Sequence, residues 1–285
     1  MNGSDLISPA QNTWCPGCGN FGIQHMIKAA IAEITGEGFP RERIVMVTGI
    51  GCHGKIADYF NINTYYAIHG RAIPVAAGIK VANPDLKVIC HVGDGDAYAE
   101  GLDHLVFAAK RNADITVIVH DNRVYGLTTG QYTPTSPAGF KGRSTPEGVP
   151  EHPINPLELM LASGATHIAR GYSRRLQPMK QAFLEGMRHR GFSFIEILQI
   201  CATYFNLTDY YNDHVYDLAE GDIDTGDYES ALATIREWDY SADAPIALGT
   251  FYRVGRPTFE ENFPARKEGM EDREGLIRDF LQGHR

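Results

Sequence analysis

The sequence has 285 residues, enough for one large domain or two small ones. Hydrophobic residues make up 43% of it and charged residues 21%, which is typical of a folded protein and excludes wholesale disorder. The formal net charge of −9 disfavours a nucleic-acid partner, and no apolar run is long enough to cross a membrane. The N-terminal residues lack the pattern of a secretion signal, and the five cysteines are an odd number. We therefore expect a cytoplasmic protein without a disulfide framework.

Short apolar segments alternate with longer amphipathic ones between about residues 20 and 200. Helices are predicted over residues 21–34, 72–82, 97–111 and 179–190. Strands are predicted over residues 43–48, 86–92, 115–120 and 192–198. Strands that alternate with helices predict an α/β fold with a mostly parallel sheet flanked by helices. Ligands of such sheets bind beyond the carboxyl ends of the strands, so the functional residues are expected there.

Two segments interrupt this alternation. Residues 125–156 are rich in Gly, Pro, Ser and Thr, which predicts a long loop of the kind that usually has a function. Residues 209–285 include an acidic, tyrosine-rich stretch with weak periodicity. We therefore divide the chain into an α/β domain over residues 1–208 and a C-terminal extension over 209–285 that packs on the core or on a partner subunit.

The sequence GDGD at residues 93–96 lies between the predicted strand 86–92 and the predicted helix 97–111. Asn122 follows the next predicted strand, so it should lie beside Asp94 at the same edge of a parallel sheet. A carboxylate and an amide oxygen suit Mg²⁺, which keeps a ligand's phosphates in its coordination shell. The glycines allow a diphosphate to approach the backbone at the start of the helix.

This spacing of Asp and Asn resembles the thiamine diphosphate (TPP) binding signature. The resemblance implies that Asp94, Asn122 and the backbone carbonyl of Val124 hold Mg²⁺. A Gly-Asp turn alone is a common structural feature, and the strand–turn–helix context with a second strand end is what favours the cofactor.

A second motif is the C-x-x-C sequence formed by Cys15 and Cys18. Cys52 and Cys201 lie at two further predicted turns, and four thiolates can hold either Zn²⁺ or a [4Fe–4S] cluster. The spacing alone does not choose between them. Cys90 lies inside an apolar strand and is interpreted as a small buried hydrophobic residue.

Six features in chain order together resemble the β subunit of 2-oxoacid:ferredoxin oxidoreductases, over residues 14–206. They are WCPGCG at 14–19, GIGCHGK at 49–55, HGRA at 69–72, GDGDAY at 93–98, DNRVYGLTTGQ at 121–131, and Cys201. The segment 153–170 is most similar to that of the 2-oxoglutarate members of the family.

The resemblance implies a fold and a set of binding residues. The fold is the TPP-binding type that holds the diphosphate, over residues 1–208 and including the N-terminal cysteine loop. Cys15, Cys18, Cys52 and Cys201 match the ligands of a [4Fe–4S] cluster. The residues matching segments that contact TPP are Ile50, Gly51, Cys52, His53, His69, Gly70, Arg71, Gly95, Asp96, Gly126 and Leu127.

The resemblance also implies an activity and partners. The activity is the oxidative decarboxylation of a 2-oxoacid with coenzyme A, best matched by 2-oxoglutarate and succinyl-CoA. TPP supplies the electron sink, and the electrons pass through the cluster to ferredoxin. The family can also run the reaction as a reductive carboxylation. Its α subunit provides the glutamate that activates TPP, so we expect this chain to be active only in an αβ heterodimer or its dimer.

Several polar residues near these motifs are candidates for binding substrate or cofactor. Lys55 and Arg71 are cations that could bind a carboxylate or phosphate, and each could equally be an ordinary surface cation. Arg143 in the long loop, or a residue of the partner, could bind the distal carboxylate of 2-oxoglutarate. His69 and His53 could donate hydrogen bonds to TPP or to developing charge, or be structural.

Three alternatives remain open from the sequence. The substrate could be pyruvate or another 2-oxoacid. The chain could belong to a non-redox TPP decarboxylase or synthase with a structural Zn²⁺ in the four cysteines. It could also be a non-catalytic scaffold, although the intact pair of Asp94 and Asn122 argues against this.

Overall fold

The computed structural model describes residues 3–218, 223–241, 243–263 and 273–283. Over these ranges, eight strands form one sheet in the order β2-β1-β3-β4-β8-β7-β10-β9. Neighbouring strands are parallel except β7 and β10, which confirms the predicted mostly parallel sheet. The strands are β1 Ile44–Thr48, β2 Asn63–Tyr66, β3 Lys87–Gly93, β4 Thr116–Asp121, β7 His167–Tyr172, β8 Ser193–Leu198, β9 Val215–Asp217 and β10 Ile246–Arg253. A separate antiparallel hairpin joins β5 Val124–Tyr125 to β6 Gln131–Tyr132.

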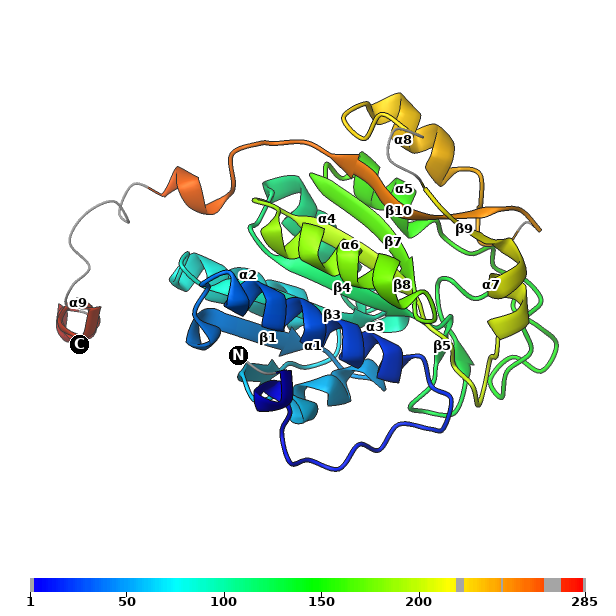
Figure 1. The fold of residues 1–285 in the computed structure, drawn as a ribbon, viewed down its shortest axis with the longest axis horizontal. Coiled ribbons are helices and arrows are strands. Elements are labelled where there is room, and N and C mark those ends of the chain that lie inside the picture. Colours follow the sequence, from blue (N-terminus) through cyan, green and yellow to red (C-terminus); the bar gives the residue numbers. More distant parts are fainter. Residues whose placement is uncertain (1–2, 219–222, 242, 264–272, 284–285) are drawn as a thin grey trace.

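Helices cover both faces of the sheet (Figure 1). On one face lie α1 Asn20–Gly36 and α6 Leu176–Arg188. On the other lie α2 Ala72–Ala82, α3 Asp94–Tyr98, α4 Leu102–Arg111, α5 Pro156–Ala162 and α8 Tyr228–Ile235. Successive strand residues point to opposite faces of the sheet. Ile89 therefore packs in the core on the side of α1 and α6, and Cys90 packs in the core on the opposite side. The fully buried Cys90 confirms its interpretation as a small core residue.

The predicted helices and strands between residues 20 and 200 occur within a few residues of their expected ends, with one correction. The prediction of a single helix over 97–111 is wrong, because the chain forms α3 and α4 with a break at residues 99–101. Gly101 lies against the carbonyls of Asp96 and Gly70, where a Cβ atom would be 2.8 and 3.0 Å from the two oxygens. The break lets the turn at Gly70 pack against the start of α4.

The segment from residue 208 onward adds helices to the fold and two strands to the main sheet. It contributes α7 Thr208–His214, strands β9 and β10, and α9 Arg273–Gly283. Strand β10 pairs antiparallel with β7 and parallel with β9, so this segment extends the main sheet. Within the ranges given above, no helix has the length and apolar character needed to cross a membrane.

A buried ion pair joins the neighbouring strands β7 and β8. Arg170 on β7 and Glu196 on β8 are almost fully buried, with 2.9 Å between Nε and Oε2. Tyr240 donates a hydrogen bond to the same Glu196 oxygen and accepts one from Arg170, each within 2.9 Å. The loop that carries Tyr240 is thereby fixed to the centre of the sheet.

We expect the substitution Arg170→Met to destabilise the protein by about 3–5 kcal/mol, because it leaves Glu196 buried without its counter-charge. The matched control is Arg236→Met, which removes an exposed pair with Glu158 and should cost no more than about 1 kcal/mol. Denaturant midpoints followed by tryptophan fluorescence would report both, since the Trp238 ring lies 5.1 Å from the Arg170 guanidinium and Trp14 lies elsewhere in both variants. If the denaturant midpoint fell equally in the two variants, the buried pair would not stabilise the fold more than the exposed pair, and the argument would be wrong.

Candidate functional site

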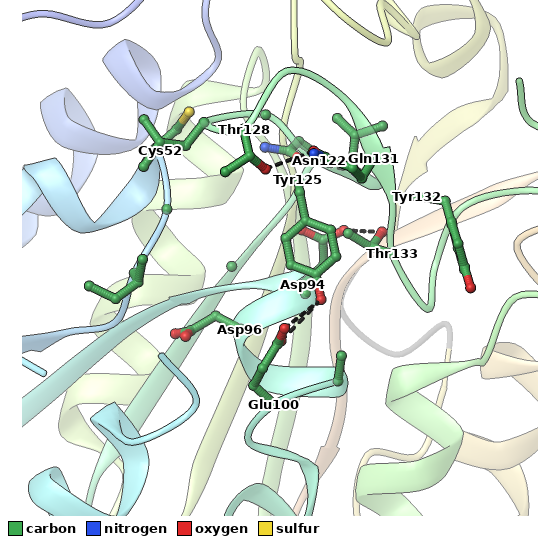
Figure 2. Close-up of a pocket in the computed structure, with 18 of the residues that line it drawn as sticks. Cys52, Asp94, Asp96, Glu100, Asn122, Tyr125, Thr128, Gln131, Tyr132 and Thr133 are labelled. Carbon is green, nitrogen blue, oxygen red and sulfur yellow. Dashed lines mark hydrogen bonds between the residues drawn. The ribbon is translucent and has the colours of Figure 1, made fainter. Parts of the chain in front are cut away.

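The carboxyl ends of β1, β3 and β4 meet at one edge of the sheet, and the turns that follow them enclose a cavity of about 620 Å³. Most of the residues predicted to bind a cofactor line this cavity. They are Ile50, Gly51, Cys52, His53, His69, Asp94, Gly95, Asp96, Asn122, Val124, Gly126 and Leu127. Figure 2 shows Cys52, Asp94, Asp96 and Asn122 around it.

Four of the residues predicted to bind TPP or substrate lie outside the cavity lining, and one of them, Arg143, donates to Thr129 Oγ1 at 3.0 Å. Gly70 donates its backbone N–H to Asp96 at 2.7 Å. The Arg71 guanidinium donates to the backbone carbonyls of Gly70 and Glu100. The Lys55 ammonium lies 3.5 Å from the Thr13 carbonyl, beside the cysteines. Among the described residues that line the 620 Å³ cavity there is no lysine or arginine.

Asp94 is a buried carboxylate at the first position of α3. The hydroxyls of Thr133 and Thr135 donate to its Oδ2 at 2.6 and 3.1 Å. Burial nevertheless raises the pKa of Asp94 to about 6, outweighing these donors. A divalent cation in the cavity would offset this cost, so the environment of Asp94 fits a cation ligand.

Asn122 and Val124 bring oxygen atoms to the same cavity from the end of β4. The Asn122 Oδ1 accepts a hydrogen bond from the Val124 N–H at 3.1 Å, and the Asn122 Nδ2 donates to Gln199 at 2.9 Å. The amide oxygen and amide nitrogen of Asn122 are therefore assigned to different partners. The carboxylate of Asp94, the amide oxygen of Asn122 and the carbonyl of Val124 are oxygen ligands of the kind that Mg²⁺ prefers.

Asp96 forms a second charged group at the cavity. His69 Nδ1 lies 2.6 Å from Asp96 Oδ1, and His53 Nε2 lies 3.7 Å from its Oδ2. Burial opposes ionisation of Asp96, but the neighbouring imidazoles of His53 and His69 and the hydrogen bond from the Gly70 amide outweigh it and hold its pKa well below the usual range. The hydrogen bond to Asp96 in turn raises the pKa of His69. The cavity thus keeps a fixed negative charge.

A close approach of backbone to Asp96 explains the glycine at position 49. A Cβ atom there would lie 1.7 Å from Asp96 Oδ2 and 2.6 Å from its Cγ, so Gly49→Ala must displace the carboxylate from its donors.

We expect the Gly49→Ala variant to lose about 1–3 kcal/mol of stability. Gly78→Ala, at an open position inside α2, should instead gain about 0.8–1 kcal/mol. The thermal unfolding midpoints of the two variants and the wild type would test this. A Gly49→Ala midpoint equal to that of the wild type would contradict the packing argument.

Four cysteines line a second, smaller cavity that adjoins the first. They are Cys15, Cys18, Cys52 and Cys201, and all are free thiols. Burial, followed by the neighbouring thiols, raises the pKa of Cys18 to about 12, so a bound metal would have to displace its proton. In the part of the chain that the structure describes, no three His, Cys, Asp or Glu side chains are grouped as a site for one metal ion. The ligand role of the four cysteines remains a prediction that rests on their lining one cavity.

The N-terminal cysteine loop is attached to the ends of two strands. The Gly19 N–H donates to the Ile200 carbonyl at 2.9 Å, just beyond β8. The Trp14 indole donates to the Cys52 carbonyl at 2.6 Å, in the turn after β1. A Cβ atom on Gly19 would lie 2.7 Å from the Ile200 nitrogen, so only glycine allows this approach. These contacts bring C-x-x-C to the remote cysteines.

Several residues of the site are not among those to which the sequence motifs assign a cofactor contact. The predicted long loop contributes Gln131, Tyr132, Thr133, Pro134, Ser144 and Glu151 to the cavity lining. Tyr125 reaches across the cavity and donates to both carboxylate oxygens of Glu100 at 3.0 Å (Figure 2). Gln199 contacts both Asn122 and Cys18. The composition of the loop indicated a function, but it did not identify these individual side chains.

Two family models match the chain. Residues 49–197 match the thiamine pyrophosphate enzyme, C-terminal TPP binding domain. Residues 201–268 match the C-terminal region of the pyruvate ferredoxin oxidoreductase beta subunit. The first match contains both strand ends of the Asp94–Asn122 site, and the second begins at Cys201.

Several proteins with assigned functions are similar to the chain over most of its length. A 2-oxoacid:ferredoxin oxidoreductase subunit beta from Sulfolobus sp is 44% identical, over 93% of this chain and 90% of that protein. The 2-oxoglutarate synthase subunit KorB from Archaeoglobus fulgidus is 41% identical, over 67% of this chain and 70% of its own. A structure of 2-oxoglutarate:ferredoxin oxidoreductase from Magnetococcus marinus, with 2-oxoglutarate, coenzyme A and succinyl-CoA bound, has a TM-score of 0.88 at 33% identity, covering 98% of this chain and 95% of that one.

Proposed function

The chain belongs to the β subunits of the 2-oxoacid:ferredoxin oxidoreductases, and from this membership we propose that it binds TPP with Mg²⁺ in the first cavity and a [4Fe–4S] cluster between its four cysteines. One observation carries the proposal. The two cavities adjoin and share Cys52, Asn122 and Gly126 in their linings. A Cβ atom on Gly126 would lie 3.5 Å from Cys52 Sγ and 3.7 Å from Cys201 Sγ. A cofactor in one cavity would therefore lie next to an electron acceptor in the other.

Asp94, Asn122 and the Val124 carbonyl are the proposed ligands of Mg²⁺. Thr133 and Thr135 hold the Asp94 carboxylate from the side of the long loop. A Cβ atom on Gly95, at the start of α3, would lie 2.2 Å from the Tyr125 ring, so glycine is needed for the ring to pack there. Asp96, ionised between His53 and His69, places negative charge where a cationic cofactor ring would be stabilised.

The proposed reaction converts a 2-oxoacid, coenzyme A and two oxidised ferredoxins into an acyl-CoA, CO₂, a proton and two reduced ferredoxins. Bound TPP supplies the nucleophilic carbon and the electron sink that the decarboxylation requires. This chain orients the cofactor through Asp94 and Asn122 and holds the proposed electron acceptor beside it through Cys52. The reverse reaction, a reductive carboxylation, uses the same groups.

As a β subunit, the chain functions with an α subunit. The lining of its first cavity supports a shared active site, since the described side chains there include four carboxylates and no lysine or arginine. A substrate carboxylate therefore needs a cation from elsewhere. We propose that the α subunit supplies it; Lys55 and Arg143 of this chain, which lie outside the lining, are the alternative candidates.

Our preferred substrate is 2-oxoglutarate, giving succinyl-CoA. The similarity to KorB subunits and to the structure with bound 2-oxoglutarate supports this choice. Pyruvate or another 2-oxoacid is the second candidate, because the chain is also similar to subunits named only for 2-oxoacids.

The test is ferredoxin reduction by the purified αβ enzyme with a panel of 2-oxoacids. We expect reduction that depends on coenzyme A and on added TPP, with the highest kcat/KM for 2-oxoglutarate. A higher value for pyruvate would overturn the substrate assignment alone. Turnover of a 2-oxoacid to an aldehyde or a condensation product, without ferredoxin reduction, would favour the non-redox alternative.

A further inference from the structure

Gln199 is a buried polar residue to which neither the family motifs nor the proposed ligand sets assign a role. It follows β8 directly and is only 2% exposed. Its backbone N–H donates to the Asp121 carbonyl at 2.8 Å, which continues the parallel pairing of β4 and β8 by one residue. Because of this register, the side chain of Gln199 lies beside that of Asn122, the next residue after Asp121.

The oxygen and the nitrogen of the Gln199 side-chain amide contact residues of two different proposed sites. Its Oε1 accepts a hydrogen bond from Asn122 Nδ2 at 2.9 Å. Its Nε2 lies 3.5 Å from Cys18 Sγ and 2.5 Å from the Ile200 carbonyl, and donates to both. One side chain therefore joins a proposed Mg²⁺ ligand to a proposed cluster ligand.

The contact with Asn122 determines which atom of that amide is available as a ligand. Because Gln199 offers only an acceptor there, Asn122 must present its nitrogen to Gln199 and its oxygen to the opposite side. The Val124 N–H, which donates to Asn122 Oδ1 at 3.1 Å, fixes the same orientation. Without Gln199, only the Val124 N–H would hold this orientation, and a rotated amide would present an NH₂ group, which cannot bind a cation.

The contact with Cys18 affects the charge on its sulfur. An N–H donor aimed at a thiolate stabilises negative charge there, and hydrogen bonds to cluster sulfurs are among the factors that set a cluster's reduction potential. Reduction adds negative charge to the cluster and its ligands. The Gln199 donor should therefore favour the reduced state.

We propose that Gln199 is a positioning residue that connects the two centres, orienting Asn122 for Mg²⁺–TPP and raising the reduction potential of the cluster through Cys18. The inference rests on the proposed function. It predicts that one substitution changes two properties measured by independent methods, although Gln199 is a ligand in neither site.

The experiment uses the purified αβ enzyme with the substitution Gln199→Met, which fills a similar volume without the amide. We expect the Kd for TPP at fixed Mg²⁺, measured by calorimetry, to rise about 10-fold or more, as is usual when a residue that orients a metal ligand is lost. We expect the cluster midpoint, measured by an EPR-monitored redox titration, to shift to a more negative potential. Gln199→Asn keeps an amide but is one methylene shorter, so it should change both quantities in the same directions.

The matched control is Gln181→Met on the exposed face of α6, where the side chain donates a hydrogen bond to Glu185 at 2.8 Å. It should alter neither quantity. If a Gln199 variant changes only one quantity, or neither, the proposed connection is wrong. A wild-type enzyme without iron would instead refute the cluster itself, so failure of the inference and failure of the proposed function can be distinguished.

Discussion

Substitution of Asp94 by alanine should abolish ferredoxin reduction by the assembled enzyme and weaken Mg²⁺–TPP binding by at least about 100-fold. Residues that only orient a metal ligand typically account for about 10–100-fold in affinity, so loss of a ligand should reach or exceed the upper end of that range. The substitution also leaves the hydroxyls of Thr133 and Thr135 without the carboxylate to which they donate. Calorimetric titration of TPP and Mg²⁺ into the purified αβ enzyme would measure the effect.

The control is Asp85→Ala, which removes an exposed carboxylate in the turn before β3. It should bind TPP like the wild type. If Asp94→Ala retained normal turnover and affinity, the assignment of the first cavity as the TPP site would be refuted.

Substitution of Cys18 by alanine should remove most of the iron and acid-labile sulfide and abolish electron transfer to ferredoxin. Three thiolates are left where the proposed [4Fe–4S] cluster needs four. TPP binding should largely remain, since Asp94 and Asn122 keep their positions at the ends of β3 and β4. Metal analysis, the visible absorbance of the cluster and TPP titration on one preparation would separate these effects.

Cys90→Ala provides the matched control for this prediction. Cys90 is buried in β3 among apolar residues, so its loss should cost about 1 kcal/mol of stability and leave the iron content unchanged. If the two variants lost equal amounts of iron, the effect of Cys18→Ala would be one of general instability rather than of ligand loss.

The sequence predicts the centre of the sheet well because β3, β4 and β8 are rich in apolar residues. It does not predict β7, since this fully buried strand contains His167 and Arg170, whose partners lie on β8. It also does not predict β2, an edge strand whose residues are all exposed. Burial of polar groups depends on partners that are distant in sequence, and local patterns contain no information about them.

The same distinction applies to the candidate site. Gly, Asp and Asn at strand ends form a local pattern, so the positions of Asp94 and Asn122 could be anticipated. The residues that donate hydrogen bonds to the site residues could not be anticipated. Thr133 and Thr135 reach Asp94 from a loop 39 and 41 residues away, and Gln199 reaches Cys18 across 181 residues. Those contacts are determined by the register of the sheet and the path of the loop.

The central claim is that TPP and a redox cluster lie side by side in this subunit. Its most direct test is to purify the αβ enzyme anaerobically and determine iron, acid-labile sulfide and zinc in the same sample. We expect at least about four irons and four sulfides per β chain, decreasing by about four of each when Cys18 is replaced. One zinc per β chain without sulfide would contradict the claim and identify a non-redox TPP enzyme.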